Sequence, residues 1–283
     1  MASVLDEAGA DRRWFAPVDP RSAERVPRFD GRRLVGTRFA EAPTTPGAPR
    51  TSAPGYLLAL FGALGARRGH RRLCRSNAVL AARNVASRLA TAQAELDEAE
   101  AGYVFLAGDS HAELLGHPAW AGRTVVNGGI GGRSARHYAE DLPRLAFRRR
   151  ASVAVLSVGT NDIMCRSKPL TQRAAALFDA SVGTILEQLR AHADRVVVLA
   201  VPPIALSGTF PRDPRAVELY SWQILRTATQ RDCAYFDPFA PIRTDDFGLA
   251  RPDALSDEVH LADYGPVWER TLAFLRSDPS GAA

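Results

Sequence analysis

The sequence has few of the residues that build disulfide frameworks or metal sites. Its 283 residues include three cysteines, Cys74, Cys165 and Cys233, which are widely separated and form no CxxC pair. This usage is typical of a reducing compartment rather than of a disulfide-stapled secreted protein. The six histidines form no HExxH motif and no paired Cys/His spacing, so the sequence predicts no metal site.

Lysine is nearly absent as well. Lys168 is the only lysine, so arginine supplies almost all of the 36 basic residues behind the net charge of +5. That excess lies in the first hundred residues, whereas residues 101–283 carry equal numbers of acidic and basic side chains. Because nucleic-acid binding needs a basic surface, we expect no nucleic-acid partner.

Long apolar runs are also missing. The longest run, residues 56–64, is roughly half the length that a membrane-spanning helix needs. The N-terminus, MASVLDEAGADRRW, has neither the basic start nor the apolar stretch of a secretory leader, so we expect a cytoplasmic protein. Basic residues follow the run, and segment 56–75 therefore has two interpretations: a helix packed on the body, which we favour, or a peripheral membrane contact.

The composition divides the chain into three parts. Residues 1–54 are rich in Pro, Arg, Ala and Thr without a persistent apolar period, which indicates an extended or disordered arm. Residues 55–101 are predicted to form a helical N-terminal extension, with its main helix starting near Ser76. The apolar residues that repeat at three- and four-residue steps on that helix are Val79, Ala82, Val85, Leu89 and Leu96.

From residue 102 to about 278, short apolar or β-branched runs alternate with helical patterns. Two of these runs are almost wholly apolar, as expected of strands that are buried on both faces in a parallel sheet. The alternation predicts a three-layer α/β fold with about five parallel strands. The predicted strands are 103–107, 124–127, 152–158, 195–201 and 233–237, and the clearest helices are 171–192, one that starts at Asp213-Pro214, and 263–275.

Chemically useful residues follow the predicted strands. The first strand is followed by Ser110, the second by the glycine cluster NGGIGG, and the third by Asn161. Beyond the fifth strand, Asp257 precedes His260 by three residues. Because functional sites of open parallel sheets lie at the carboxyl ends of the strands, we expect these residues to share one edge.

This set fits acyl-transfer chemistry. A serine hydroxyl needs a base to take its proton, and we expect His260 to be that base, oriented by Asp257. Ser110 begins a predicted helix, so its amide has no helical acceptor. With the amide of Gly129 and the side-chain amide of Asn161, it would form an oxyanion hole. We expect the preceding residue, Asp109, to brace the loop backbone without taking part in the chemistry.

Four blocks in this order resemble the SGNH, or GDSL-type, hydrolase family: GDS with Ser110, NGGIGG with Gly129, GTND with Asn161, and DEVH with Asp257 and His260. The resemblance covers roughly residues 103–276 and makes 102–278 the catalytic domain. It implies a flavodoxin-like sheet, a Ser–His–Asp triad, hydrolysis of small acyl or acetyl esters or thioesters, and no metal or organic cofactor.

Several points stay open from the sequence. His111 departs from the aliphatic residue of many relatives, and we expect it to line the acyl pocket wall, with substrate binding as the alternative. Arg133 and Cys165 are more simply explained as a solvated and a packed side chain than as site residues. An acyl or acetyl transferase would use the same residues, a non-catalytic binding protein could share the fold, and a nucleotide binder ranks last because the glycine cluster lacks the GxGxxG pattern. The sequence does not indicate the oligomeric state.

Overall fold

The structure, a computed structural model, describes residues 79–120, 122–206 and 211–277. These residues belong to one compact unit of the chain, Leu60–Ala283. The predicted arm over 1–54 and the segment 56–75, with its two interpretations, lie outside the described residues.

Five parallel strands form a single sheet in the order β2-β1-β3-β4-β5. This order reverses direction between β1 and β3, as in flavodoxin-like sheets, and the predicted α/β fold with about five parallel strands is confirmed. Each strand lies within two residues of its predicted place. The strands are β1 (Val104–Gly108), β2 (Val125–Gly129), β3 (Ala151–Ser157), β4 (Ala193–Leu199) and β5 (Ala234–Phe236).

Successive side chains of the central strands enter two different cores. In β1, Phe105 packs into one apolar cluster, whereas its neighbours Val104 and Leu106 pack into another. Strands β3 and β4 alternate in the same way, because consecutive side chains of a strand point to opposite faces of the sheet. Both faces are therefore covered, and this explains the continuous apolar runs of the sequence.

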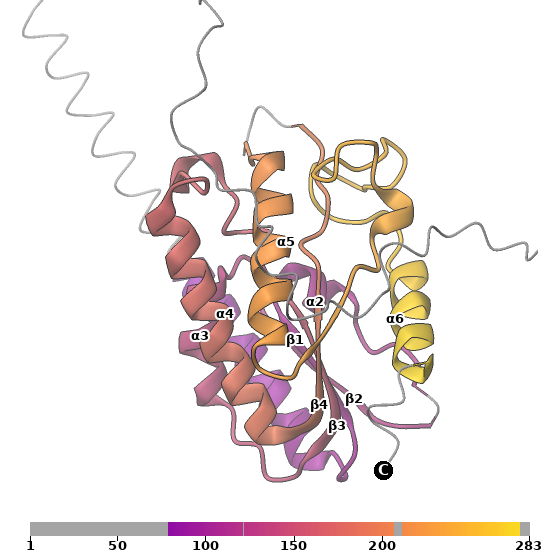
Figure 1. Cartoon of the computed structure of the whole chain (residues 1–283). Helices are drawn as coiled ribbons and strands as arrows, with labels where there is room; N and C mark the ends of the chain where they lie inside the picture. Colours follow the sequence, from indigo (N-terminus) through magenta and orange to yellow (C-terminus); the bar gives the residue numbers. More distant parts are fainter. Residues whose placement is uncertain (1–78, 121, 207–210, 278–283) are drawn as a thin grey trace, which may run out of the picture. The chain divides into compact units, whose positions relative to one another are not determined.

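Helices form the outer two layers. Residues of the helix over 79–98 and of α3, α4 and α5 share one apolar cluster with the sheet, and residues of α6 share the other. In Figure 1, α3, α4 and α5 accordingly lie on one side of the strands and α6 on the other. The helices are α2 (Ser110–Leu114), α3 (Ala135–Asp141), α4 (Gln172–His192), α5 (Pro214–Thr229) and α6 (Gly265–Ser277), with short 3-10 turns at Leu142–Arg144, Cys165–Ser167 and Ala240–Ile242.

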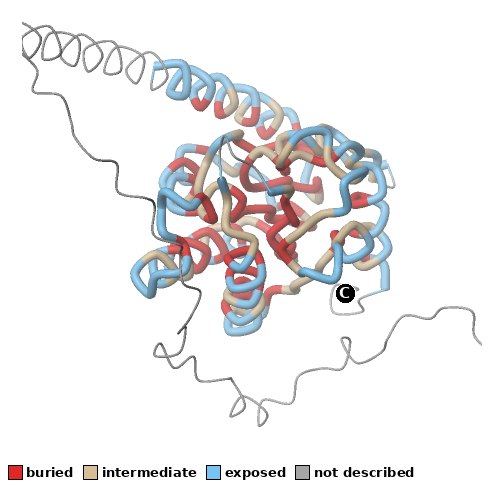
Figure 2. The backbone as a smooth tube through the Cα atoms, turned by 90° about the horizontal axis from the view of Figure 1, so that it is seen from above, coloured by how far each residue is buried: buried red, intermediate tan, exposed pale blue. Residues whose placement is uncertain are grey.

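The helix over 79–98 joins the sheet through the second half of its length. Its buried stripe begins at Val85 and continues through Leu89, Ala92 and Leu96, all of which belong to the core cluster that contains Phe105. Val79 is 52 % exposed, although the repeat predicted it on the inner face. Figure 2 shows this gradient, with an exposed leading end and buried residues along the turns that follow. The helix and the sheet thus share one core across the predicted boundary at 101/102.

Helix α4 matches the predicted span of 171–192, with one error in its inner face. Leu177, predicted to face inward, is 48 % exposed, and the next residue, Phe178, takes the buried place. A helix turns by about 100° per residue, so a stripe that is displaced by one position moves a side chain from the core to the surface. The remaining predicted residues of that face, among them Ile185 and Leu189, are buried.

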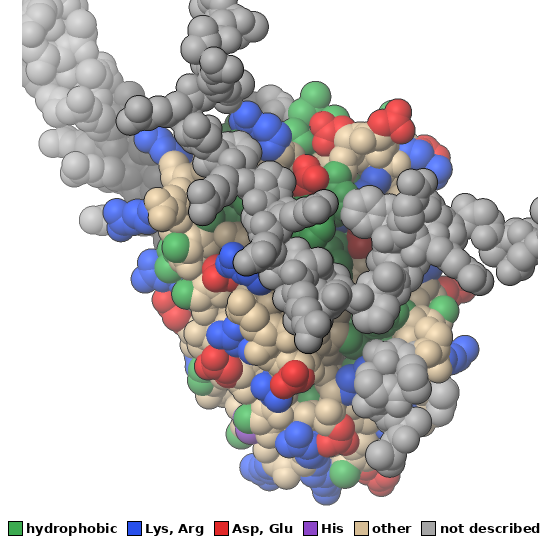
Figure 3. All heavy atoms as spheres, viewed as in Figure 1, with side chains coloured by type: hydrophobic (Ala, Val, Ile, Leu, Met, Phe, Trp, Pro, Cys, Tyr) green, Lys and Arg blue, Asp and Glu red, His purple; other side chains and the backbone are tan. Residues whose placement is uncertain are grey.

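Charges of both signs are interspersed on the face of the molecule seen in Figure 3. Ion pairs such as Arg226–Asp179 and Arg231–Glu187 link α5 and its following turn to α4. Among the described residues, none of the helices is both long enough and apolar enough to span a bilayer.

Candidate active site

The site begins at the tight turn between the end of β1 and the start of α2. Gly108 closes the strand, Asp109 caps α2, and Ser110 is the first residue of that helix. Asp109 is fully buried, and its Oδ1 accepts a hydrogen bond of 3.0 Å from the backbone N–H of His111. The expected bracing role of Asp109 is therefore confirmed, and Ser110 is left partly exposed at the carboxyl end of the sheet.

Ser110, His260 and Asp257 form one continuous chain of hydrogen bonds. His260 Nε2 lies 3.0 Å from Ser110 Oγ, and His260 Nδ1 lies 2.8 Å from Asp257 Oδ2. Ser110 and His260 are 150 positions apart in the sequence. The imidazole thus has a carboxylate on one nitrogen and a hydroxyl on the other, which is the arrangement that activates a serine nucleophile.

The loop that carries Asp257 and His260 is held by its own backbone. Asp257 Oδ1 accepts hydrogen bonds from the N–H groups of Val259 and His260, each at 2.7 Å. Burial alone would raise the pKa of Asp257, but these bonds and the one from the His260 ring lower it to about 2. The carboxylate therefore stays charged at neutral pH and can hold the Nδ1–H of His260.

The glycine cluster is the part of the predicted site where the structure differs from the expectation. The Gly129 amide, predicted to face an oxyanion, donates to Asn127 Oδ1 at 2.9 Å. Gly129 is buried, and a Cβ atom there would lie 2.2 Å from the backbone nitrogen of Glu113, so this glycine serves the close packing of β2 on α2. The amide of Gly131 is also engaged, at 2.6 Å from Glu113 Oε2.

Gly132, which the sequence reasoning missed, has the properties that Gly129 lacks. It is exposed, a Cβ atom there would have no neighbour within 4 Å, and its N–H has no acceptor among the described residues. The adjoining Gly131 lies against the nucleophile, since a Cβ atom built on it would be 3.8 Å from Ser110 Cβ. The sequence signal that could have indicated Gly132 is its position as the last residue of the NGGIGG block.

Asn161 reaches the same turn from the end of β3. Its Nδ2 donates to the carbonyl of Arg133 at 3.1 Å, which places the side-chain amide beside the glycine cluster. The second hydrogen of that amide has no acceptor within the described part of the chain. The neighbouring Asp162 accepts from Ala135 N–H at 2.9 Å and so supports the start of α3 instead.

His111 lies beneath the site. Its side chain is 1 % exposed, its Nδ1 lies 3.1 Å from the hydroxyl of Tyr264, and its ring centroid is 5.6 Å from that of His260. Burial, with the nearby His260 and Arg212, lowers the pKa of His111 to about 3, so the ring is neutral. This position suits the predicted wall of the site and leaves no exposed surface for the alternative of direct substrate contact.

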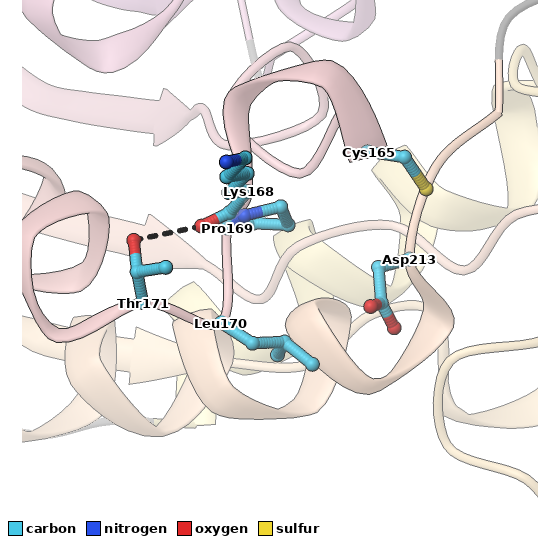
Figure 4. Close-up of a pocket in the computed structure, with 6 residues that line it drawn as sticks. All are labelled: Cys165, Lys168, Pro169, Leu170, Thr171 and Asp213. Carbon is cyan, nitrogen blue, oxygen red and sulfur yellow. Dashed lines mark hydrogen bonds between the residues drawn. The ribbon is translucent and has the colours of Figure 1, made fainter.

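Arg133 and Cys165 do not take part in the hydrogen-bond chain Ser110–His260–Asp257. Arg133 is paired with Asp141 through a 2.6 Å contact from its Nε. Cys165, which the sequence suggested is packed, is instead exposed and lines a hollow of about 230 Å³ between the start of α4 and the start of α5. Figure 4 shows that hollow, where Thr171 Oγ1 donates to the Lys168 carbonyl, and none of the predicted site residues lines it. Within the described ranges, no group of three His, Cys, Asp or Glu side chains is arranged to hold a metal ion.

Asp109 provides a test by pH, because burial raises the pKa of its carboxyl to about 7 although the His111 N–H opposes the shift. A carboxyl with a raised pKa in the folded protein stabilises the fold below its unfolded pKa, near 4, and that contribution is lost as the pH rises through 7. Asn is uncharged at every pH, so Asp109→Asn should gain stability relative to wild type as the pH rises. We expect the melting temperature of the variant, minus that of wild type, to increase by about 5 °C between pH 5 and pH 8.

The matched control for that experiment is Asp245→Asn, since Asp245 is exposed. Its melting-temperature difference from wild type should be the same at both pH values. A difference that is equally flat for Asp109→Asn would mean that Asp109 keeps one protonation state over this range.

Comparison with known proteins identifies the family of the chain. The model of the GDSL-like Lipase/Acylhydrolase family matches residues 90–265, which is more than half of the chain. The chain therefore belongs to that family and is an ester-hydrolysing enzyme. Curated proteins contain no match to the chain.

Solved structures support the fold independently. A Streptococcus pneumonia protein, named as a candidate platelet activating factor, superposes with a TM-score of 0.58 at 16% identity, covering 72% of this chain and 98% of that one. A GDSL-like lipase from Bacteroides thetaiotaomicron superposes with a TM-score of 0.51 at 18% identity, covering 69% of this chain and 95% of that one. At these identities the likeness concerns the fold.

Proposed function

We propose that the chain is a serine esterase that cleaves small acyl or acetyl esters. The observation that carries the proposal is the hydrogen-bond chain Ser110–His260–Asp257 at the carboxyl end of the sheet. Ser110 Oγ attacks the ester carbonyl while His260 Nε2 takes its proton. His260 then returns the proton to the leaving alcohol, and Asp257 orients the imidazole and stabilises its charged form.

The developing oxyanion would be held by three donors. These are the backbone amide of Ser110 at the start of α2, the backbone amide of Gly132 and the side-chain amide of Asn161. Gly132 replaces Gly129 in this proposal, because the Gly129 N–H already donates to Asn127. Support for Gly132 comes from its exposed position, from an amide that has no acceptor in the described ranges, and from the closeness of Gly131 to the nucleophile.

The open position of the site supports a small acyl group. Gly132 is exposed, and the His260 side chain keeps 33% of its surface accessible beside the partly buried Ser110. A long acyl chain requires an enclosed apolar surface to cover it, whereas an acetyl group needs little more than the space around the reacting carbonyl.

The experiment that tests the function compares wild type with Ser110→Ala on p-nitrophenyl esters of increasing acyl length. Turnover that depends on Ser110 and is greatest for the shortest chains is expected. Product analysis by mass spectrometry with an added alcohol distinguishes hydrolysis, which releases free acid, from acyl transfer, which forms a new ester. Turnover that is independent of Ser110 would refute the proposal.

Asn161 gives a prediction specific to the oxyanion hole. Asn161→Ala removes one donor that is aimed at charge formed in the transition state, and we expect kcat to fall by about 100-fold or more with little change in KM. Steady-state kinetics on the best p-nitrophenyl ester measure this effect. Asn161→Asp serves as a companion, since it keeps the shape of the side chain and places a negative charge where the oxyanion forms. A kcat within about twofold of wild type in both variants would remove Asn161 from the site.

A further inference from the structure

The outer edge of β2 is bonded to the helix over 79–98. Strand β2 has β1 on one side only, so the backbone groups of its other side need partners. Arg88 supplies two of them, with Nε donating to the Gly129 carbonyl and Nη2 donating to the Asn127 carbonyl, both at 3.0 Å. Glu95, two turns further along, accepts from the Asn127 N–H at 2.9 Å.

Asn127 connects this edge to the turn that carries the nucleophile. Its side chain is 1 % exposed, and Oδ1 accepts from the Gly129 amide and from Arg88 Nη2 at 3.3 Å. Its Nδ2, which carries two hydrogens, lies within hydrogen-bond distance of three carbonyls in and after α2, those of Ala112, Glu113 and Gly116. One buried amide group therefore holds α2 and the first part of the glycine cluster together.

Glu113 extends the same network to the middle of the cluster. Its Oε1 lies 3.6 Å from Arg88 Nε, and its Oε2 accepts from the Gly131 amide at 2.6 Å. Arg88 therefore contacts both side chains that hold the glycine cluster. Asn127 accepts from the Gly129 amide, and Glu113, on α2, accepts from the Gly131 amide. The next amide, that of Gly132, is left with no acceptor among the described residues.

We propose that Arg88 is a positioning residue for the enzyme's oxyanion-binding turn, although it precedes the family match, which begins at residue 90. The inference rests on the proposed function, in which Gly132 and Asn161 bind the oxyanion. Such donors act only when they are held close to the developing charge, and a displacement of about 1 Å can cost 100-fold in rate. The Arg88 side chain is mostly buried, with 19% of its surface exposed. It forms charge-assisted hydrogen bonds to Asn127 and Gly129, in the segment that leads into this turn.

The alternative is that the helix merely stabilises the fold through its apolar stripe. Four variants separate the two roles: Arg88→Ala, Arg88→Lys, Arg83→Ala and Val85→Ala. Arg83 is exposed on the same helix and has no hydrogen bond or ion pair with another described residue, whereas Val85 is buried in the core cluster that the helix shares with the sheet. Lysine keeps the charge of Arg88 but has one nitrogen, so it cannot reproduce the planar fork whose Nε and Nη2 bond two different carbonyls.

We expect Arg88→Ala to lower kcat by about tenfold to 100-fold with KM nearly unchanged, measured well below its melting temperature. Arg88→Lys should recover part of that loss, and Arg83→Ala should match wild type. Val85→Ala should lower the melting temperature while leaving kcat close to wild type. The rate at which a fluorophosphonate labels Ser110 should fall in parallel with kcat in the Arg88 variants.

Two results would overturn the inference. One is an Arg88→Ala enzyme with the kcat and labelling rate of wild type. The other is a loss of kcat in Val85→Ala as large as in Arg88→Ala at the same distance below the melting temperature, which would assign the effect to loosening of the helix. Failure of the proposed function is recognised separately, because Ser110→Ala would then keep full turnover and wild-type Ser110 would not react with the probe.

Discussion

Ser110→Ala should abolish almost all ester turnover, with a loss of at least about 10⁴-fold in kcat. The hydroxyl of Ser110 is the atom that His260 Nε2 contacts at 3.0 Å, and no covalent acyl intermediate can form once it is removed. The backbone amides stay in place in the variant, so binding of the ester should change little. The measurement is steady-state hydrolysis of the best p-nitrophenyl ester, together with covalent labelling by a fluorophosphonate.

Two controls make that result specific. Ser167→Ala removes an exposed serine outside the site and should keep wild-type turnover. The melting temperature of Ser110→Ala should stay close to that of wild type, because Ser110 is partly exposed and, among the described residues, its hydroxyl bonds only to His260. A Ser110→Ala protein that folds and still turns over the ester at the rate of wild type would show that another group performs the attack.

Gly108→Ala should have the largest effect on stability. Gly108 has a φ of +132°, and a Cβ atom there would lie 1.8 Å from the carbonyl oxygen of Ser157 on the neighbouring strand β3. No side-chain rotation relieves a clash with backbone, so β1 and β3 would have to separate beneath the nucleophile. We expect a loss of more than about 4 kcal/mol in the free energy of unfolding, or failure to fold.

Gly116→Ala is the matched control for this substitution. Gly116 also has a positive φ, +64°, but a Cβ atom there would have no neighbour within 4 Å. It should therefore lose about 1–2 kcal/mol, the cost of the backbone conformation alone. Urea unfolding of both variants measures the difference between them. Equal losses would mean that the contact between Gly108 and β3 is not what requires glycine at the end of β1.

The strands and helices were predictable because their signals are local. Short, largely apolar runs mark β1, β3 and β4, and Asp213-Pro214 marks the start of α5. The serine, the histidine and the aspartate were also within reach, since each follows a recognisable strand or stands at a fixed spacing from its partner. Leu177 shows the limit of this approach, because a helix period locates a stripe only to within about one residue.

The sequence by itself determined the succession of strands and helices along the chain and the family. It also determined which three residues, Ser110, His260 and Asp257, would come together. Only the tertiary structure decided that the Gly129 amide is used by Asn127, that Gly132 is open, that His111 is buried beneath His260, and that Arg88 reaches the glycine cluster. The physical reason is that a backbone amide carries no mark in the sequence of the acceptor it will find. That acceptor is set by side chains that packing brings from distant elements.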